Sequence, residues 1–224
     1  MSGNIIIAID GASGVGKGTL SKRLAVHYKF PTLDTGSLYR GVTLYISNHF
    51  NIETISTWEI IKISEQISSS GEISAWSVRP DIRGPVISRH VPTVSSIPEV
   101  RQILHKYQTD FGNNPPGQAH GAVLEGRDIG TNIFPNATAK IYLTASPEIK
   151  ARRRFDEYVA AGEKPEFDVI LADMIKRDRQ DSERSQAAGK LQAAPDALII
   201  NTDNLTADEV FSRARGYIDG MMTQ

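Results

Sequence analysis

The chain of 224 residues contains no cysteine, which excludes a disulfide scaffold and any metal site built from thiolates. It also lacks a stretch that approaches the roughly 20 apolar residues needed to span a bilayer. The N-terminus does not show the order of a signal peptide, in which basic residues precede an apolar run. These absences lead us to expect a soluble cytoplasmic protein that does not bind membranes.

An excess of either charge is missing as well, since the formal net charge is −1. A near-neutral chain argues against binding of nucleic acid through bulk electrostatics. Cations are nevertheless concentrated in the C-terminal half, at Arg152-Arg153-Arg154 and between Arg177 and Arg184. Local basic pockets of this kind fit a small anionic ligand. The hydrophobic content of 40% and the length suit one α/β domain with an insertion or a small mobile lobe.

The first 28 residues contain the most informative pattern, which is a strand, a glycine-rich loop and a helix. Residues 5–9 form a β-branched apolar run, and Leu20, Leu24 and Tyr28 lie on one stripe of the following segment. The spacing G-x-x-x-x-G-K between them predicts a phosphate-binding loop, because glycine amides and a helix start can surround an anion while the lysine adds a full charge. We therefore predict that ATP phosphates bind to Gly11, Ala12, Ser13, Gly14, Val15, Gly16, Lys17, Gly18 and Thr19.

The residue after Lys17 is Gly18, where most such loops carry Ser or Thr. The hydroxyl that usually meets Mg²⁺ is thereby displaced to Thr19. This form of the loop is typical of nucleoside monophosphate kinases rather than of GTPases or motor ATPases.

Strands alternate with helices along the rest of the chain, which predicts an α/β fold with a parallel sheet and helices on both faces. The exception is the segment 48–97, where Ser, Ile and Thr dominate and prolines are frequent. Residues 73–78 alternate with a period of two. We expect an inserted lobe of helices with a small antiparallel sheet. The later strands are expected at 32–34, 122–124, 140–143 and 197–200.

Three predicted strands end in polar side chains, and such ends meet at one edge of a parallel sheet. They are Asp10 before the glycine loop, Asp34-Thr35 with Arg40 one turn on, and Glu125-Gly126-Arg127-Asp128. Each has a structural alternative, since Asp34 could cap a helix and Arg127 could pair with Asp128. Their convergence on the edge that carries the phosphate loop favours a functional site.

The helix that starts near Pro165 turns from apolar to charged along one face. Its core stripe of Phe167, Ile170, Leu171 and Met174 is continued by Arg177, Asp181 and Arg184 at spacings i, i+4 and i+7. This pattern indicates a helix that leaves the core and enters a cleft. The alternative is a solvated helix end with an Asp181–Arg184 ion pair.

Four blocks of this sequence resemble the signature blocks of bacterial cytidylate kinases. The first three are residues 9–19, 33–40 and 125–131, and the fourth is Arg177-Asp178 with Asp181 and Arg184. The blocks follow in the family's order, and the resemblance runs from residue 5 to about residue 215. It implies transfer of the ATP γ-phosphoryl group to CMP or dCMP with Mg²⁺, by a P-loop NTPase fold with a three-layer core, a five-stranded parallel sheet, an inserted monophosphate-binding lobe and a short lid.

The resemblance also assigns segments and residues. The core comprises 1–47, 98–152 and 166–224, the monophosphate-binding lobe 48–97 and the lid 153–165. We expect catalysis by Lys17, Arg127, Arg153 and Arg154, because cations beside a triphosphate site neutralise charge on the transferred group. Thr19, from the loop pattern, and Glu125, from the resemblance, are expected to hold Mg²⁺, in part through water. The positions that match the family's CMP-binding residues are Thr35, Arg40, Arg101, Arg127, Asp128, Arg177, Asp181 and Arg184.

One position departs from the family pattern. Nine residues before Arg101, a serine that contacts the base is common, and this chain has Pro92 followed by Thr93. The implied partners are ATP and CMP or dCMP, without nucleic acid or membrane, and the expected state is a monomer.

Two other interpretations stay open. A kinase for another small acceptor, such as UMP, AMP or shikimate, would share the phosphate loop. A regulatory ATP-binding module without turnover would share it too. A GTPase is disfavoured, because residues 201–204 do not form the Asn-Lys-x-Asp motif that reads guanine.

Overall fold

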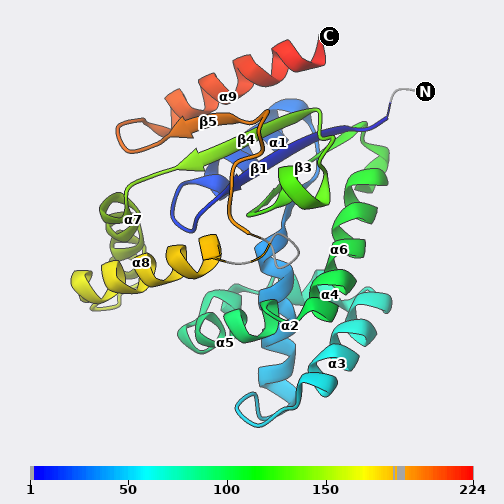
Figure 1. Cartoon of the computed structure of the whole chain (residues 1–224), viewed down its shortest axis with the longest axis vertical. Coiled ribbons are helices and arrows are strands. Elements are labelled where there is room, and N and C mark those ends of the chain that lie inside the picture. Colours follow the sequence, from blue (N-terminus) through cyan, green and yellow to red (C-terminus); the bar gives the residue numbers. More distant parts are fainter. Residues whose placement is uncertain (1–2, 184, 186–189, 224) are drawn as a thin grey trace. The chain divides into compact units, whose positions relative to one another are not determined.

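The computed structural model describes residues 3–183, 185 and 190–223 (Figure 1). The chain divides into two compact units. The first unit consists of residues 1–33 and 112–224, and the second of residues 34–111.

A five-stranded sheet forms the centre of the first unit, in the strand order β2-β3-β1-β4-β5. β1 pairs in parallel with β3 and β4, and β4 pairs in parallel with β5. The predicted α/β class with a five-stranded parallel sheet and flanking helices is confirmed. The strand bounds are β1 Ile5–Gly11, β2 Thr32–Asp34, β3 Gly121–Gly126, β4 Ala139–Thr144 and β5 Leu198–Asn201.

One face of the sheet is covered by two helices, α1 (Lys17–Tyr28) and α9 (Ala207–Met222), as Figure 1 shows. The other helices of this unit are α7 (Pro147–Ala160), α8 (Phe167–Glu183) and the short turns η2 (Pro116–Gln118) and η3 (Ile129–Ile133). Ser146 caps α7 ahead of Pro147, and Thr206 forms a capping box with Glu209 at the start of α9.

Strand alternation decides which side chains face α1. Ile7 and Ile9 of β1 belong to the core beneath α1 and α9, together with Val123 of β3. Because successive side chains of a strand point to opposite faces, Glu125 shares the α1 face with Val123, whereas Asp10 lies on the other face. η3 contacts β1. The carboxylates of Glu125 and Asp10 therefore lie on opposite faces of the sheet.

The second unit is built around α2 (Thr35–His49), which contacts α3, α4, η1 and α5. The Cβ that a larger residue would add at Gly41 of α2 lies 3.0 Å from the Ser77 nitrogen, so glycine allows α2 and α4 to approach closely. α6 starts in this unit and ends two residues beyond it. The bounds are α3 Thr57–Ser69, α4 Glu72–Ser77, η1 Pro80–Arg83, α5 Pro85–Ser95 and α6 Pro98–Asn113.

The small antiparallel sheet predicted within residues 48–97 is wrong, since the backbone described over that range contains helices and turns but no strand. The alternating residues 73–78 lie mostly in α4. Ile73 and Ser77, four residues apart, are its buried positions, whereas Val78 is 78% exposed. A helical period of burial thus replaced the period of two that the residue types suggested.

Among the described residues, no helix combines the length and the apolar character needed to cross a membrane. The predicted bounds of the inserted lobe and of the lid, at 48–97 and 153–165, remain predictions.

Candidate active site

The phosphate loop connects β1 to α1 in a conformation that needs glycine. Gly14 and Gly16 have φ angles of 84° and 98°, in the left-handed region where other residues are strained. A Cβ at Gly14 would also lie 3.1 Å from the Cβ of Lys150 on α7. Gly16 precedes α1, whose first amides donate no hydrogen bond to a capping side chain. The loop thus has the backbone geometry that anion binding requires.

Lys17 lies across this loop at the first position of α1. Its Nζ donates to the carbonyl oxygens of Gly11, at 2.8 Å, and Ala12, at 2.7 Å. The ammonium group is therefore held over the first residues of the loop. This position suits a cation that meets phosphate oxygens bound to the loop amides.

Arg153 of α7 supports the loop from its outer side. It donates to the Gly14 carbonyl at 3.1 Å and to the carbonyl of Thr202, which follows β5, at 2.8 Å. The Thr202 hydroxyl lies 3.2 Å from the Val15 carbonyl. These bonds fix two loop carbonyls. Arg154 pairs with Glu157 at 2.9 Å, and the predicted parts of both arginines in phosphoryl transfer remain predictions.

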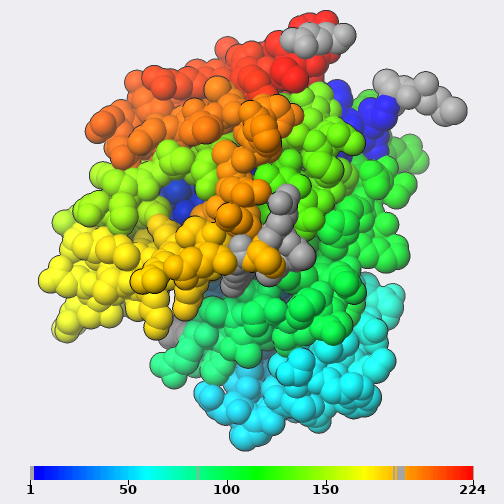
Figure 2. All heavy atoms as spheres, in the orientation of Figure 1, coloured from blue at the N-terminus to red at the C-terminus, as the bar shows by residue number. Residues whose placement is uncertain are grey.

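The surface around the loop is open to solvent. Figure 2 shows part of the blue N-terminal segment exposed between the yellow-green atoms of the α7 region and the orange segment that leads to β5. Gly16 and Thr19 are exposed, whereas Val15 is buried. A nucleotide can reach the loop from this side.

Glu125, at the end of β3, faces the start of α1. Its carboxylate oxygens lie 3.5 and 3.8 Å from the position that a Cβ of Gly18 would take. A Cβ after Lys17 would thus be in ordinary van der Waals contact with this carboxylate, so Glu125 lies directly beside the start of α1. The described residues contain no group of three or more His, Cys, Asp or Glu that could hold a metal by itself. Mg²⁺ with one carboxylate and substrate phosphates fits this arrangement, because Mg²⁺ in kinases keeps several waters and needs few protein ligands.

Arg127 follows β3 and pairs with Asp181 of α8 rather than with Asp128. The Asp181 side chain is only 2% exposed. Desolvation, together with the nearby Arg177, lowers the pKa of the Arg127 guanidinium, and Asp181 and Asp178 act in the opposite direction. Arginine stays protonated, so Arg127 remains a cation. It lies near the half-buried Arg177.

The apolar stripe predicted for α8 packs against α7. Ile170 and Met174 are buried against α7, and Asp181 continues the same face. Asp178 pairs with Lys150 of α7, so an ion pair joins the two helices. This part of the prediction for α8 is confirmed, whereas Arg184 lies outside the described residues.

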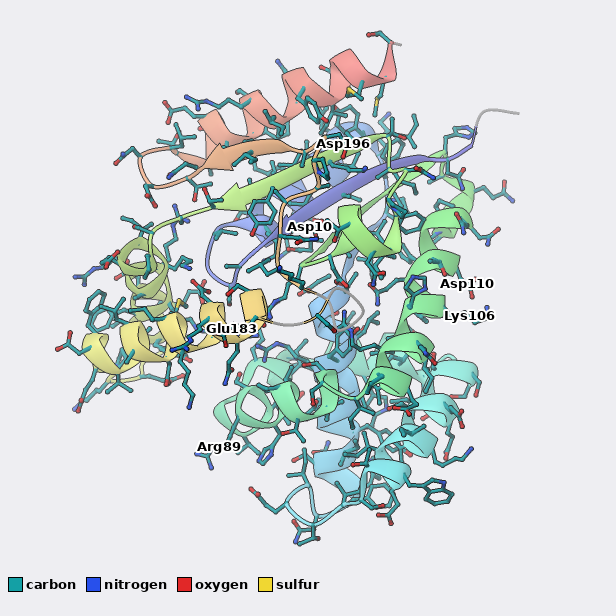
Figure 3. The ribbon with its side chains drawn as sticks, in the orientation of Figure 1. Asp10, Arg89, Lys106, Asp110, Glu183 and Asp196 are labelled. Atoms are coloured by element: carbon teal, nitrogen blue, oxygen red, sulfur yellow. The ribbon has the colours of Figure 1, made fainter. Side chains whose placement is uncertain are left out.

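Asp10 and Asp128 lie close together behind the loop. Asp10 Oδ1 accepts from the amide of Ile129 at 2.8 Å, and Oδ2 from that of Gly130 at 2.7 Å. Burial raises the pKa of Asp10 to about 7, with Asp128 adding to the rise and the two amides and Lys17 opposing it. Asp128 is 8% exposed, and its Oδ2 accepts from Asn132 Nδ2 at 3.2 Å. Figure 3 shows Asp10 at the end of β1 beside η3.

The second unit holds the other residues predicted to bind CMP. Thr35 starts α2 directly after Asp34, which caps this helix by accepting from the Ser37 amide. Arg40 is buried and donates to the Ile82 carbonyl at 3.1 Å and to Ser88 at 3.0 Å. The Arg101 guanidinium lies 5.6 Å from the centre of the Tyr39 ring. Pro92 lies inside α5, and Thr93 after it is exposed.

Sequence reasoning missed two residues that support the loop, Lys150 and Thr202. Thr202 directly follows β5, so the rule that strand ends meet at one edge could have found it. Lys150 gave no signal, because a lysine in a helix is normally solvated.

A glycine loop at the end of the central strand of a parallel sheet, with a lysine at the start of the next helix, defines a P-loop nucleotide-binding protein as the class. The chain belongs to the cytidylate kinase family, whose sequence profile matches residues 7–219. It is 44% identical to a cytidylate kinase of Corynebacterium efficiens over 219 residues, which are 94% of this chain and 92% of that protein. Identity to the cytidylate kinase of Corynebacterium glutamicum is 41% over 217 residues, covering 93% and 92% of the two chains.

The fold recurs at low sequence identity. The crystal structure of an uncharacterized protein from Eubacterium ventriosum superposes with a TM-score of 0.53 at 14% identity, covering 96% of this chain and 98% of that one. This similarity concerns the fold alone.

Proposed function

We propose that this protein transfers the γ-phosphoryl group of ATP to CMP or dCMP, which yields ADP and CDP or dCDP. The proposal rests on the pairing register of β1 and β3. Asp10, the residue before the phosphate loop, lies opposite Gly126, the residue before Arg127 and Asp128. The donor loop and the predicted acceptor turn thus leave the sheet from adjacent strands, at the same level.

On the donor side, the loop amides and Lys17 bind the β- and γ-phosphates. Glu125 on the α1 face and the Thr19 hydroxyl would hold Mg²⁺, in part through water, and the ion would neutralise charge on these phosphates when ATP is bound. Arg153 and Arg154 on α7 assist at the transferred group, and Arg153 also holds the loop through its bonds to Gly14 and Thr202.

On the acceptor side, Arg127 and Arg177 bind the phosphate and sugar of CMP, and Asp181 keeps Arg127 in place through their ion pair. Asp128 accepts from the exocyclic amine of cytosine. In the second unit, Thr35 and Arg40 match the family positions that hold the acceptor phosphate, and Arg101 matches one that reads the base. Arg184 completes the set.

The chemistry needs no covalent catalyst. An oxygen of the CMP phosphate attacks the γ-phosphorus while the bond to the β-phosphate oxygen of ATP breaks, and ADP leaves. Because charge spreads over the transferred oxygens, positioned cations supply most of the catalysis. Lys17 and Arg127 are buried or partly buried cations of the required kind.

The competing interpretations differ from this proposal in one measurement each. A kinase for UMP or AMP would phosphorylate that acceptor faster than CMP. A regulatory module would bind ATP without turnover. We infer that the protein acts as a cytoplasmic monomer.

The test is to incubate the purified protein with ATP, Mg²⁺ and CMP and to follow ADP and CDP by chromatography. We expect both products in equal amounts, and a loss of at least about a hundredfold in kcat for Lys17→Met, because its charge meets the transferring group. Circular dichroism and CMP binding serve as controls and should change little in this variant. Absence of CDP with the wild-type protein, or near wild-type turnover of Lys17→Met, would contradict the proposal.

A further inference from the structure

Asp10 is a buried carboxylate that the reaction as described does not use. Only 5% of the residue is exposed. Both of its oxygens accept from consecutive backbone amides, those of Ile129 and Gly130. These amides directly follow Asp128, the residue assigned to the cytosine base.

The turn that Asp10 holds is unusual in its geometry. η3 is a single wide turn, in which the Phe134 amide donates to the Ile129 carbonyl and the amides of Asn132 and Ile133 donate to that of Asp128. The first amides of any helical turn have no partner within it. Asp10 supplies the acceptors for two of them, so it determines where this turn begins.

A close approach makes the contact specific. A Cβ at Gly130 would lie 3.4 Å from Asp10 Oδ2 and 3.2 Å from the Lys140 side chain. Lys140 is itself buried and bound to Asp196. The turn therefore packs closely on the side chains of Asp10 and Lys140, and a shift of the Asp10 carboxylate must move the backbone next to Asp128.

Two other roles for Asp10 disagree with these contacts. A general base would need an oxygen directed at the acceptor, and a magnesium ligand would need one directed at the phosphates. Both oxygens instead accept from amides on the face of the sheet opposite to α1. Glu125 lies on the α1 face. Hydrogen bonds from two consecutive amides to the two oxygens of one buried carboxyl group fix the orientation of that group.

We propose that Asp10 is a positioning residue for base selection: by clasping the amides of Ile129 and Gly130 it fixes Asp128 in the orientation that reads cytosine. The inference rests on the proposed role of Asp128. It also makes one strand, β1, responsible for both the phosphate loop and the geometry of the acceptor turn.

The test compares Asp10→Asn with the wild type in steady-state kinetics with CMP, UMP and ATP. Asparagine keeps the size but presents an NH₂ group to one of the two amides, so the clasp is broken. We expect kcat/KM for CMP to fall about tenfold more than that for UMP, which corresponds to about 1.4 kcal/mol, while KM for ATP changes less than about twofold. A wild-type ratio of CMP to UMP, or a defect confined to ATP, would overturn the inference.

Thr138→Val is the matched control. It removes a hydroxyl that accepts from the Ile6 amide at 3.2 Å, at the other end of β1, and so costs stability without touching the turn. Its ratio of CMP to UMP should equal that of the wild type. Should the ratio fall here as well, general destabilisation explains the effect and the clasp is refuted.

Asp128→Ala separates this inference from the proposed function. If it loses discrimination and Asp10→Asn does not, the clasp alone fails. If Asp128→Ala keeps discrimination, the assignment of the base fails and the inference with it. When both lose it, the double variant should lose no more than Asp128→Ala, because the two residues act as one unit. Gly130→Ala retains Asp10 and adds a Cβ 3.2 Å from the Lys140 side chain, which presses the turn away from the surface that Asp10 holds. It should lower the ratio too and replaces Asp10→Asn if that variant does not fold; an unchanged ratio would overturn the inference.

Discussion

The buried and half-buried ionisable side chains at the strand ends of the first unit each have specific partners. Lys17 lies across the loop, Arg127 pairs with Asp181, and Asp10 accepts from two amides. An unpaired buried charge would cost several kcal/mol, so each partner also contributes to stability. Substitutions at these residues therefore need a measurement of folding beside every measurement of activity.

Asp128 provides the sharpest prediction at this scale. A carboxylate accepts from the exocyclic amine of cytosine, whereas uracil presents a carbonyl oxygen at that position and would face the charge with lone pairs. In Asp128→Ala, kcat/KM for CMP and dCMP should fall about tenfold to a hundredfold more than that for UMP. Equal losses with both acceptors would make Asp128 a structural residue of the turn.

The pKa of Asp10 gives a prediction on stability. It is raised from 3.8 in the unfolded chain to about 7, mainly by burial, and Asp128, Lys17 and Tyr142 are the charged or titratable groups near it. Between these two values the folded protein binds more protons than the unfolded chain, so the Asp10 contribution to the free energy of unfolding falls as pH rises.

The measurement is urea unfolding of wild type and Asp10→Asn between pH 4 and 8, without nucleotide or Mg²⁺. The difference in unfolding free energy, wild type minus variant, should decline with a slope approaching about 1.4 kcal/mol per pH unit. Other titrating groups largely cancel in this difference. A difference that is flat or rises with pH would show that the carboxylate is ionised in the folded protein throughout the range.

At the scale of single elements, α8 joins the core to Arg127, which we propose to bind the acceptor. Its buried residues pack on α7, and the same face then presents Asp181 to Arg127. We predict that Arg177→Met and Asp181→Ala raise KM for CMP about tenfold or more, through lost charge-assisted hydrogen bonds, with KM for ATP unchanged. Initial rates at varied CMP and varied ATP check this.

Arg179→Met is the control for α8. Arg179 is 78% exposed and pairs with Glu183 one turn further on, so its loss removes a surface pair and leaves the inner face intact. Both KM values should stay at the wild-type level. If Arg177→Met and Asp181→Ala instead raised only KM for ATP, this face of α8 would belong to the donor side.

For the whole molecule, local signals predicted most of the fold. The β1 run and the glycine loop depend on neighbouring residues, and the structure confirms them. The segment 73–78 was mispredicted because its burial depends on packing against α2, at Gly41, which the local pattern does not contain. Tertiary packing overrode a short alternation there.

The site was predictable to the extent that it lies at strand ends. The parallel-sheet rule placed Asp10, Glu125, Arg127 and Asp128 at one edge, and the registers confirm it for β1 and β3. The same rule could not show that Arg127 pairs with Asp181 instead of Asp128, or that Asp10 holds the turn after Asp128. Such contacts join residues 54 and 119 positions apart and depend on which face each side chain takes.

The measurement that tests the central claim most directly is a comparison of acceptors with the wild-type protein. Initial rates are taken with ATP, Mg²⁺ and, in turn, CMP, dCMP, UMP and AMP at matched concentrations. We predict that CMP and dCMP are phosphorylated with kcat/KM values at least about tenfold above those of UMP and AMP, since one base contact supplies a discrimination of that size. A higher kcat/KM for UMP or AMP than for CMP would contradict the assignment of this protein as a cytidylate kinase.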